Sequence, residues 1–326
     1  MTSKLTIPPE EISKMREIRQ KRLEQFKERA KEINLSPLPK GQSYKAIAIS
    51  VDASNVPVET DVVDGVVLRC ADSNNGVHFQ DLVMTDGPVD EIEKFLDRLF
   101  STVPVLVKLL AKMQAPSWKK LTDFSGVAHG RSDLDRFVME LLEWGSLVTL
   151  AEKSSQTILL KDGMLRGKAI KPQGPYLDNL RKFFEENCKS NGNFVVGIAK
   201  ESSVLEKYKT LLKFVEGFKS NRGFYLKIPQ ELLEETYGWR YLAADITWGN
   251  LYFVRLQTHS SGRIMTMEIP DFLENRLDDV LKILADFKLR SLPERFRGLP
   301  DPIACAHENT NLIMNLGKSL QKEIMK

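Results

Sequence analysis

Apolar residues recur every three or four positions in several segments of the chain, which is the spacing of one helical face. The first stripe runs from Ile12 to Ile33 and follows Pro8 and Pro9, and a proline followed by acidic residues is a common helix start. The same spacing predicts further helices over residues 89–113 (interrupted by Pro104), 132–152, 175–189, 203–219, 273–287 and from 302 onward.

Short apolar runs between these segments predict strands. Residues 46–51 form a nearly continuous apolar run, so we expect a buried strand there, with Asp52 at its end. One or two further strands fall within 61–72, where Asp64-Gly65 signals a turn. Later strands are predicted over 156–165, with Asp162 at the exit, over 194–200, and in a hairpin over 251–270 around Ser260-Ser261-Gly262.

The order of these elements indicates the fold class. Strands cluster early and later alternate with helices, which favours a mixed α/β fold with a core sheet flanked by helices. The sequence contains no repeat, no low-complexity segment and no strong linker. We therefore expect an N-terminal helical arm over residues 1–40 and one domain over residues 41–326.

Composition narrows the class of protein. The chain has 326 residues, of which 42% are hydrophobic and 28% charged, as in an ordinary soluble globular protein. No apolar run is long enough to span a membrane, and the N-terminus lacks the apolar stretch of a secretory signal. Cys70, Cys188 and Cys305 lie far apart and show no zinc-binding spacing. A reducing cytoplasm fits this usage best.

The charge is uneven along the chain. A net charge of +3 is too small to indicate nucleic-acid binding by itself. Residues 1–40, however, hold ten Lys and Arg against six Asp and Glu, a net of +4, so the remainder is close to neutral. This basic arm could contact phosphate or an acidic partner, and a solvated helix face explains it equally well.

Two acidic residues stand where apolar strands are predicted to end, Asp52 in ISVDAS and Asp162 in ILLKDG. A strand end is rigid, and two carboxylates on neighbouring strands can share a divalent cation. Mg²⁺ and Mn²⁺ prefer such oxygen ligands and can activate water for phosphodiester cleavage. The other interpretation is that each Asp simply begins a turn.

Weaker candidates surround this pair. Glu140 and Glu143 share one face of a predicted helix, so either could supply a third carboxylate. His307, after a small apolar stretch, could be a metal ligand, a general acid or a phosphate contact. Lys200 ends a predicted strand and could neutralise a phosphate. Taken singly, Glu140, Glu143 and His307 are each better explained by a structural or surface role, and Lys200 is explained equally well by one.

The order of these motifs resembles the NurA nuclease family. The segments ISVDAS, a Glu-bearing helix, ILLKDGML, VVGIAKES and GLPDPIACAHENTN follow one another over about residues 45–312. The resemblance implies a ribonuclease-H-like core over the domain at 41–326. It also implies a Mn²⁺-dependent deoxyribonuclease, with Mg²⁺ possible and one or two ions bound.

The resemblance assigns roles by position. Asp52 and Asp162 match the two metal-binding aspartates, and His307 matches the C-terminal histidine. Glu140 matches the helical glutamate, with Glu143 as the alternative, and Lys200 matches the strand-end lysine. These residues would be catalytic, with Asp52, Glu140, Asp162 and His307 also holding the metal.

The family also implies partners and a process. Its members act on single-stranded DNA and duplex ends, with 5′-to-3′ exonuclease and single-strand endonuclease activity. They form homodimers and work with a hexameric HerA helicase-translocase in DNA end resection and double-strand break repair. The apolar stripe of the arm would then lie at a dimer interface, against the motor, or on the chain's own core.

Three departures from the family pattern indicate a divergent member. Ala53 replaces a glycine after the first Asp, Met164 a serine after Asp162-Gly163, and Leu299 an aromatic residue before His307. They motivate an alternative in which the chain is a non-catalytic subunit that docks on the motor or binds nucleic acid.

Overall fold

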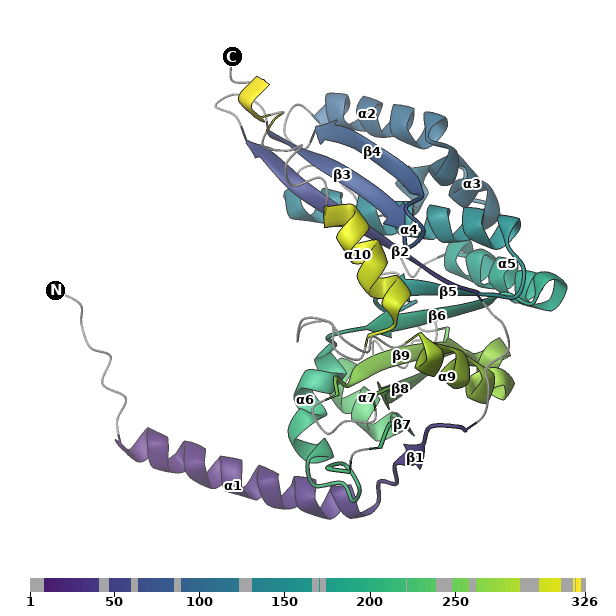
Figure 1. Ribbon diagram of the computed structural model, residues 1–326. Helices are drawn as coiled ribbons and strands as arrows, with labels where there is room; N and C mark the ends of the chain where they lie inside the picture. The colour runs from purple at the N-terminus through teal and green to yellow at the C-terminus, as the bar shows by residue number, and fades with distance from the viewer. Residues whose placement is uncertain are drawn as a thin grey trace.

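The computed structural model shows a single mixed sheet with helices on both faces (Figure 1). It describes residues 9–40, 47–59, 64–84, 89–122, 131–165, 170, 174–220, 222–238, 248–257, 262–287, 299–311, 319 and 321–323. Within these residues, nine strands follow the order β1-β7-β8-β9-β6-β5-β2-β3-β4.

The strands are β1 (Ser36–Pro37), β2 (Ile47–Glu59), β3 (Asp64–Asp72), β4 (Val77–Met84), β5 (Thr157–Asp162), β6 (Phe194–Ala199), β7 (Phe224–Lys227), β8 (Gly249–Arg255) and β9 (Met265–Pro270). The helices are α1 (Pro9–Lys31), α2 (Val89–Thr102), α3 (Pro104–Met113), α4 (Arg131–Lys153), α5 (Tyr176–Asn191), α6 (Ser203–Leu212), α7 (Gln230–Tyr237), α9 (Leu277–Asp286) and α10 (Asp301–Asn311). Short 3₁₀ turns, η1 (Trp118–Lys120) and η2 (Asp271–Arg276), complete the described elements.

The half of the sheet from β4 to β6 has the expected ribonuclease-H-like arrangement. β2, β3 and β4 form an antiparallel meander, and β5 and β6 then add parallel to β2. The order β4-β3-β2-β5-β6, with β3 as the antiparallel member, is that of the ribonuclease H core. The mixed α/β class predicted from the sequence is therefore confirmed.

Alternation along the strands divides the core between the two faces of the sheet. Val51 and Leu159 point to one face and join the cluster formed with α2, α3, α4 and α5. Ala48 and Leu160 point to the other face and join the cluster formed with α9 and α10. Helix α10 thereby lies across β2 on the face opposite α4 (Figure 1).

Two local expectations from the sequence were wrong. Strand β2 does not end before Asp52 but continues to Glu59, because residues 51–59 pair with β3. Asp64-Gly65 is not a turn, since Gly65 pairs with both Val58 and Met84 inside the sheet. A Cβ at Gly65 would lie 3.1 Å from the Val83 carbonyl oxygen, so glycine there permits close strand packing.

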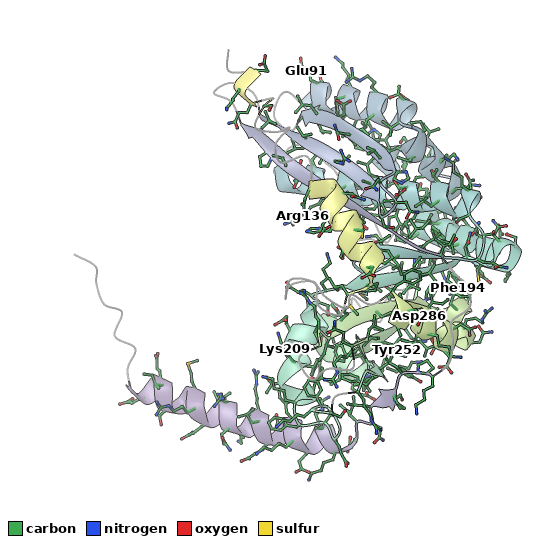
Figure 2. The ribbon with its side chains drawn as sticks, viewed as in Figure 1. Glu91, Arg136, Phe194, Lys209, Tyr252 and Asp286 are labelled. Carbon is green, nitrogen blue, oxygen red and sulfur yellow. The ribbon has the colours of Figure 1, made fainter. Side chains whose placement is uncertain are left out.

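Helix α1 divides into an anchored half and a projecting half (Figure 2). Near its C-terminal end, Phe26 packs on Tyr208 of α6, Arg29 forms an ion pair with Glu235 of α7, and Ala30 is buried. Toward the N-terminus the apolar stripe continues into solvent. No helix in the described part of the chain has the length and apolarity needed to cross a bilayer.

The segment after β5 crosses closely over β6, and Gly197 makes this possible. A Cβ at Gly197 would lie 2.8 Å from the Gly163 oxygen and 2.9 Å from the Leu165 nitrogen, which are both backbone atoms. Gly163 itself has φ of +112°, in the region that glycine favours. Glu268 accepts a hydrogen bond from the Leu165 amide at 2.7 Å and so holds the same segment.

We predict that Gly197→Ala lowers the free energy of unfolding by about 1–3 kcal/mol, because the added methyl group has to displace backbone atoms rather than a flexible side chain. Urea denaturation followed by circular dichroism would measure this change. A variant as stable as the parent protein would show that the crossing segment yields easily and does not depend on the missing Cβ.

Candidate metal centre

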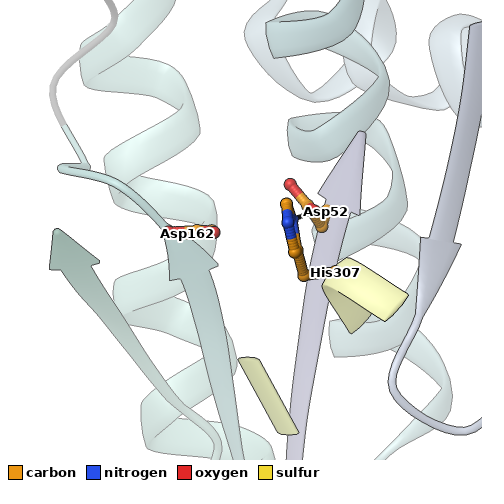
Figure 3. A group of neighbouring side chains, drawn as sticks. All are labelled: Asp52, Asp162 and His307. Atoms are coloured by element: carbon orange, nitrogen blue, oxygen red, sulfur yellow. Dashed lines mark hydrogen bonds and ion pairs between the residues drawn. The ribbon is translucent and has the colours of Figure 1, made fainter. Parts of the chain in front are cut away.

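Three predicted site residues converge at one point of the sheet. Asp52 lies in β2, Asp162 is the last residue of β5, and His307 lies on α10 (Figure 3). One potential ligand atom from each lies within 4.8 Å of the others. Two carboxylate oxygens and an imidazole nitrogen at this separation can surround a single divalent cation.

The register of the parallel strands explains why the two aspartates meet. Ile47 pairs with Thr157 and Val51 with Lys161, so the next position in each strand brings Asp52 beside Asp162. Both side chains point to the face covered by α10, as Ala48 and Leu160 do. β5 ends at Asp162 while β2 continues, so the carboxylates stand where β2 loses its parallel neighbour.

Burial of α10 places His307 over this point. The helix buries Ile303, Ala304 and Ala306, which fixes the turn that carries the histidine. His307 Nδ1 lies 2.9 Å from Asp52 Oδ2. Because a carboxylate offers only acceptors, Nδ1 is the donor in this bond.

Asp162 is largely buried and forms an ion pair with Lys200. Burial raises the pKa of its carboxyl group, and the nearby charge of Asp52 acts in the same direction. Lys200 opposes both effects through an ion pair of 2.6 Å between its Nζ and Asp162 Oδ2. Two acidic groups held together in a partly desolvated place fit a divalent cation, whose charge would offset their repulsion.

The helical glutamates lie apart from this three-residue group. Glu143 on α4 is buried and forms an ion pair of 2.8 Å with Lys161 of β5, which is also buried. Burial raises the pKa of Glu143 to about 7, although Lys161 works against the shift. Glu140 is partly exposed, and its charge acts on both members of this pair. Glu143 is thus engaged in neutralising Lys161.

Sequence reasoning missed residues whose importance depends on tertiary contacts. Thr310, three residues after His307, places its hydroxyl oxygen 3.1 Å from Asp52 Oδ2. Lys161 gave no signal because its partner Glu143 is 18 residues away on another element. Glu268 did carry a signal, since a charged residue in the otherwise uncharged strand MTMEIP has to find partners inside the protein.

Comparisons with known proteins were made by sequence and by structure. The sequence model of the NurA domain matches residues 81–312, most of the chain. No curated protein matches this chain in sequence.

Among solved structures, the NurA nuclease from Sulfolobus solfataricus aligns over 96% of this chain and 95% of its own, with 12% identity and a TM-score of 0.49. A structure of NurA with manganese aligns over 94% and 96%, with 10% identity and a TM-score of 0.45. Endonuclease V from Bacillus subtilis aligns over 91% of both chains, with 14% identity and a TM-score of 0.36.

We predict that Glu143→Gln lowers the free energy of unfolding by roughly 3–5 kcal/mol, because it leaves the Lys161 ammonium buried without its ion-pair partner. The double variant Glu143→Leu/Lys161→Met removes both charges and should recover most of this loss. Glu140→Gln on the same helix serves as the control and should change stability by less than about 1 kcal/mol. Equal stabilities for all three variants would show that the pair is not energetically coupled.

Proposed function

The chain belongs to the NurA family, and on that premise we propose that it is a metal-dependent deoxyribonuclease that hydrolyses phosphodiester bonds. The observation that carries the proposal is the convergence of Asp52, Asp162 and His307 from two adjacent strands and a distant helix. Such a donor set suits a divalent cation and leaves space in the coordination sphere for substrate oxygens.

Asp52, Asp162 and His307 would hold the cation, and Glu140 would join them as the helical carboxylate, with one or two Mn²⁺ or Mg²⁺ ions bound. Glu140 is preferred over Glu143 because Glu143 neutralises Lys161. When bound, a divalent cation withdraws charge from the phosphate ester and makes a nearby water easier to deprotonate.

The protein's own groups would orient the reactants. Asp52 fixes the imidazole of His307 through Nδ1, so Nε2 either completes the coordination or accepts a proton from the attacking water. Lys200 forms its ion pair with Asp162 at a partly exposed edge of the site. Its ammonium group would steady the scissile phosphate or the attacking water there.

The finer activity is proposed from the family resemblance. It comprises 5′-to-3′ exonuclease and single-strand endonuclease cleavage of DNA, in the cytoplasm, during end resection and double-strand break repair. A HerA-type hexameric ATPase would be the motor partner. In this scheme residues 41–326 form the nuclease domain, and residues 1–40 form an arm available for association.

The alternative of a non-catalytic subunit rests on Ala53, Met164 and Leu299. Ala53 lies in β2 opposite Cys70, where the extended backbone does not require glycine. Met164 and Leu299 are buried in two of the core clusters, so both act as packing residues. None of the three replacements removes a group from the candidate metal centre, which supports the catalytic proposal.

We predict that the protein cleaves end-labelled single-stranded and duplex DNA with Mn²⁺ or Mg²⁺ and not with EDTA. Asp52→Asn should reduce cleavage by more than about 100-fold, because changes to groups behind a metal ligand alone cost 10–100-fold. Asp178→Asn, at an exposed position of α5, is the matched control and should retain full activity.

Circular dichroism would establish that the Asp52→Asn protein is folded. Metal-dependent cleavage that survives in this variant would exclude Asp52 as a ligand. If the parent protein is inactive with every metal, the assay is repeated with a HerA-type motor. Inactivity in that mixture, together with metal-independent DNA binding, would favour the non-catalytic alternative.

We further propose that the projecting half of α1 forms the homodimer interface. Ile12, Met15 and Ile18 lie on one side of the helix and are 39%, 68% and 50% exposed. They continue the stripe whose later members, Phe26 and Ala30, pack on the chain's own α6 and α7 region. An apolar stripe in water is stabilised when a second helix covers it.

Accordingly, Met15→Glu/Ile18→Glu should convert the dimer to a monomer, as measured by light scattering, without altering the anchored half of the helix. Ser13→Glu/Gln20→Glu adds the same charge on the opposite side of α1 and should leave the dimer intact. Dimers that persist in the first variant would place the interface elsewhere.

A further inference from the structure

Thr310 reaches the candidate metal centre from the last turn of α10. Thr310 is fully buried, and its hydroxyl oxygen lies 3.1 Å from Asp52 Oδ2. The same oxygen lies 3.0 Å from the carbonyl oxygen of His307, one helical turn earlier. Both neighbours are acceptors, so the hydroxyl group has to act as a donor.

The hydroxyl group has a single hydrogen, and its two acceptors differ in strength. The Asp52 carboxylate is charged, and hydrogen bonds to charged acceptors are about twice as strong as those to neutral ones. A threonine in a helix commonly bonds the carbonyl group of the preceding turn. Here the carboxylate competes with that carbonyl for the same hydrogen, and its charge favours the bond to Asp52.

Thr310 is held in place by contacts that do not involve the metal centre. Ser54 Oγ of β2 donates a hydrogen bond of 3.0 Å to the Thr310 carbonyl oxygen. Next to it, Asn309 Nδ2 donates a bond of 2.8 Å to the carbonyl oxygen of Asp72 in β3. The last turn of α10 is therefore fastened to two strands, so the position of the hydroxyl group relative to β2 is fixed.

The plane of the Asp52 carboxylate has to be set by its neighbours. The terminal torsion of an aspartate has broad minima, so the strand backbone alone does not set the plane of the carboxylate. His307 and Thr310 both contact Oδ2, from two positions on α10. Two donors on one oxygen define the plane and leave the remaining lone pairs in a set direction.

We propose that Thr310 is a positioning residue that orients the Asp52 carboxylate for a divalent cation. This inference rests on the proposed metal-dependent function and deepens it. In this role Thr310 acts through Asp52. Groups behind a metal ligand tune affinity by fixing the ligand's orientation, typically by 10–100-fold.

The test compares Mn²⁺ affinity in Thr310→Val, Thr310→Ser and the parent protein, measured from the electron paramagnetic resonance signal of free Mn²⁺. Valine has the shape of threonine but no donor, so Thr310→Val should bind Mn²⁺ about 10-fold more weakly. Serine keeps the hydroxyl group and should restore affinity to within about threefold.

Thr149→Val provides a matched control. Thr149 is also a buried helical threonine, and its hydroxyl group donates a 2.9 Å hydrogen bond to the Gly145 carbonyl within α4. This variant should bind Mn²⁺ as the parent does. Thermal unfolding of all three variants without metal would establish that each is folded at the temperature of the titration.

The outcomes separate the inference from the function on which it rests. A parent protein that binds Mn²⁺, with equal affinity in Thr310→Val, would overturn the positioning role and leave the proposed function intact. Loss of affinity in both Thr310→Val and Thr310→Ser would also overturn it, because packing and not the donor would be responsible. A parent protein that binds no Mn²⁺ would overturn the metal-dependent function itself.

Discussion

The parallel register of β2 and β5 is the constraint on which the candidate site depends. It sets Asp52 and Asp162 side by side on one face of the sheet. The pairing is buried on both faces, by α2–α5 on one side and by α9 and α10 on the other. A shift of one residue in either strand would send one carboxylate into the apolar layer on the opposite face.

The two faces of β2 and β5 carry different arrangements of charged residues. On the α4 side, Lys161 and Glu143 form a closed ion pair with no net charge. On the α10 side, Asp52 and Asp162 face each other, and Lys200, His307 and Thr310 are polar neighbours of this pair. Removing either member of the buried Glu143–Lys161 pair would destabilise the fold. The two aspartates, in contrast, hold negative charge at a partly exposed edge of the sheet. The adjacent residues Lys161 and Asp162 therefore point to opposite faces of the sheet, Lys161 to the buried ion pair and Asp162 to the candidate metal centre.

Much of the fold could be predicted because the stripes and apolar runs are long. The helices over 89–113, 132–152 and 175–189 and the strands near Asp162 and Lys200 are observed close to their predicted bounds. The extent of β2 was not predictable from its apolar run, because its second half is stabilised by pairing with β3. The spacing of apolar residues indicates which face of an element is buried, but it does not indicate which strand pairs with it.

The candidate site was predictable in part, and for a related reason. Asp52 and Asp162 stood out because acids at the edge of apolar runs are conspicuous, and the structure does bring them together with His307. Thr310 and the Glu143–Lys161 pair could not be found, since each depends on contacts between distant elements. The assignment of Glu140 as a metal ligand, and the catalytic roles of the whole set, stay predictions.

The distance along the chain between Asp52 and His307 has a consequence for biosynthesis. The two residues that meet in the site are 255 positions apart. The ribosome therefore releases the strands that carry both aspartates long before the helix that covers them. Until α10 emerges and docks, a growing chain has its acidic pair without the histidine or the threonine that orients it. The group formed by Asp52, Asp162 and His307 is therefore assembled only after residues 301–311 have been synthesised.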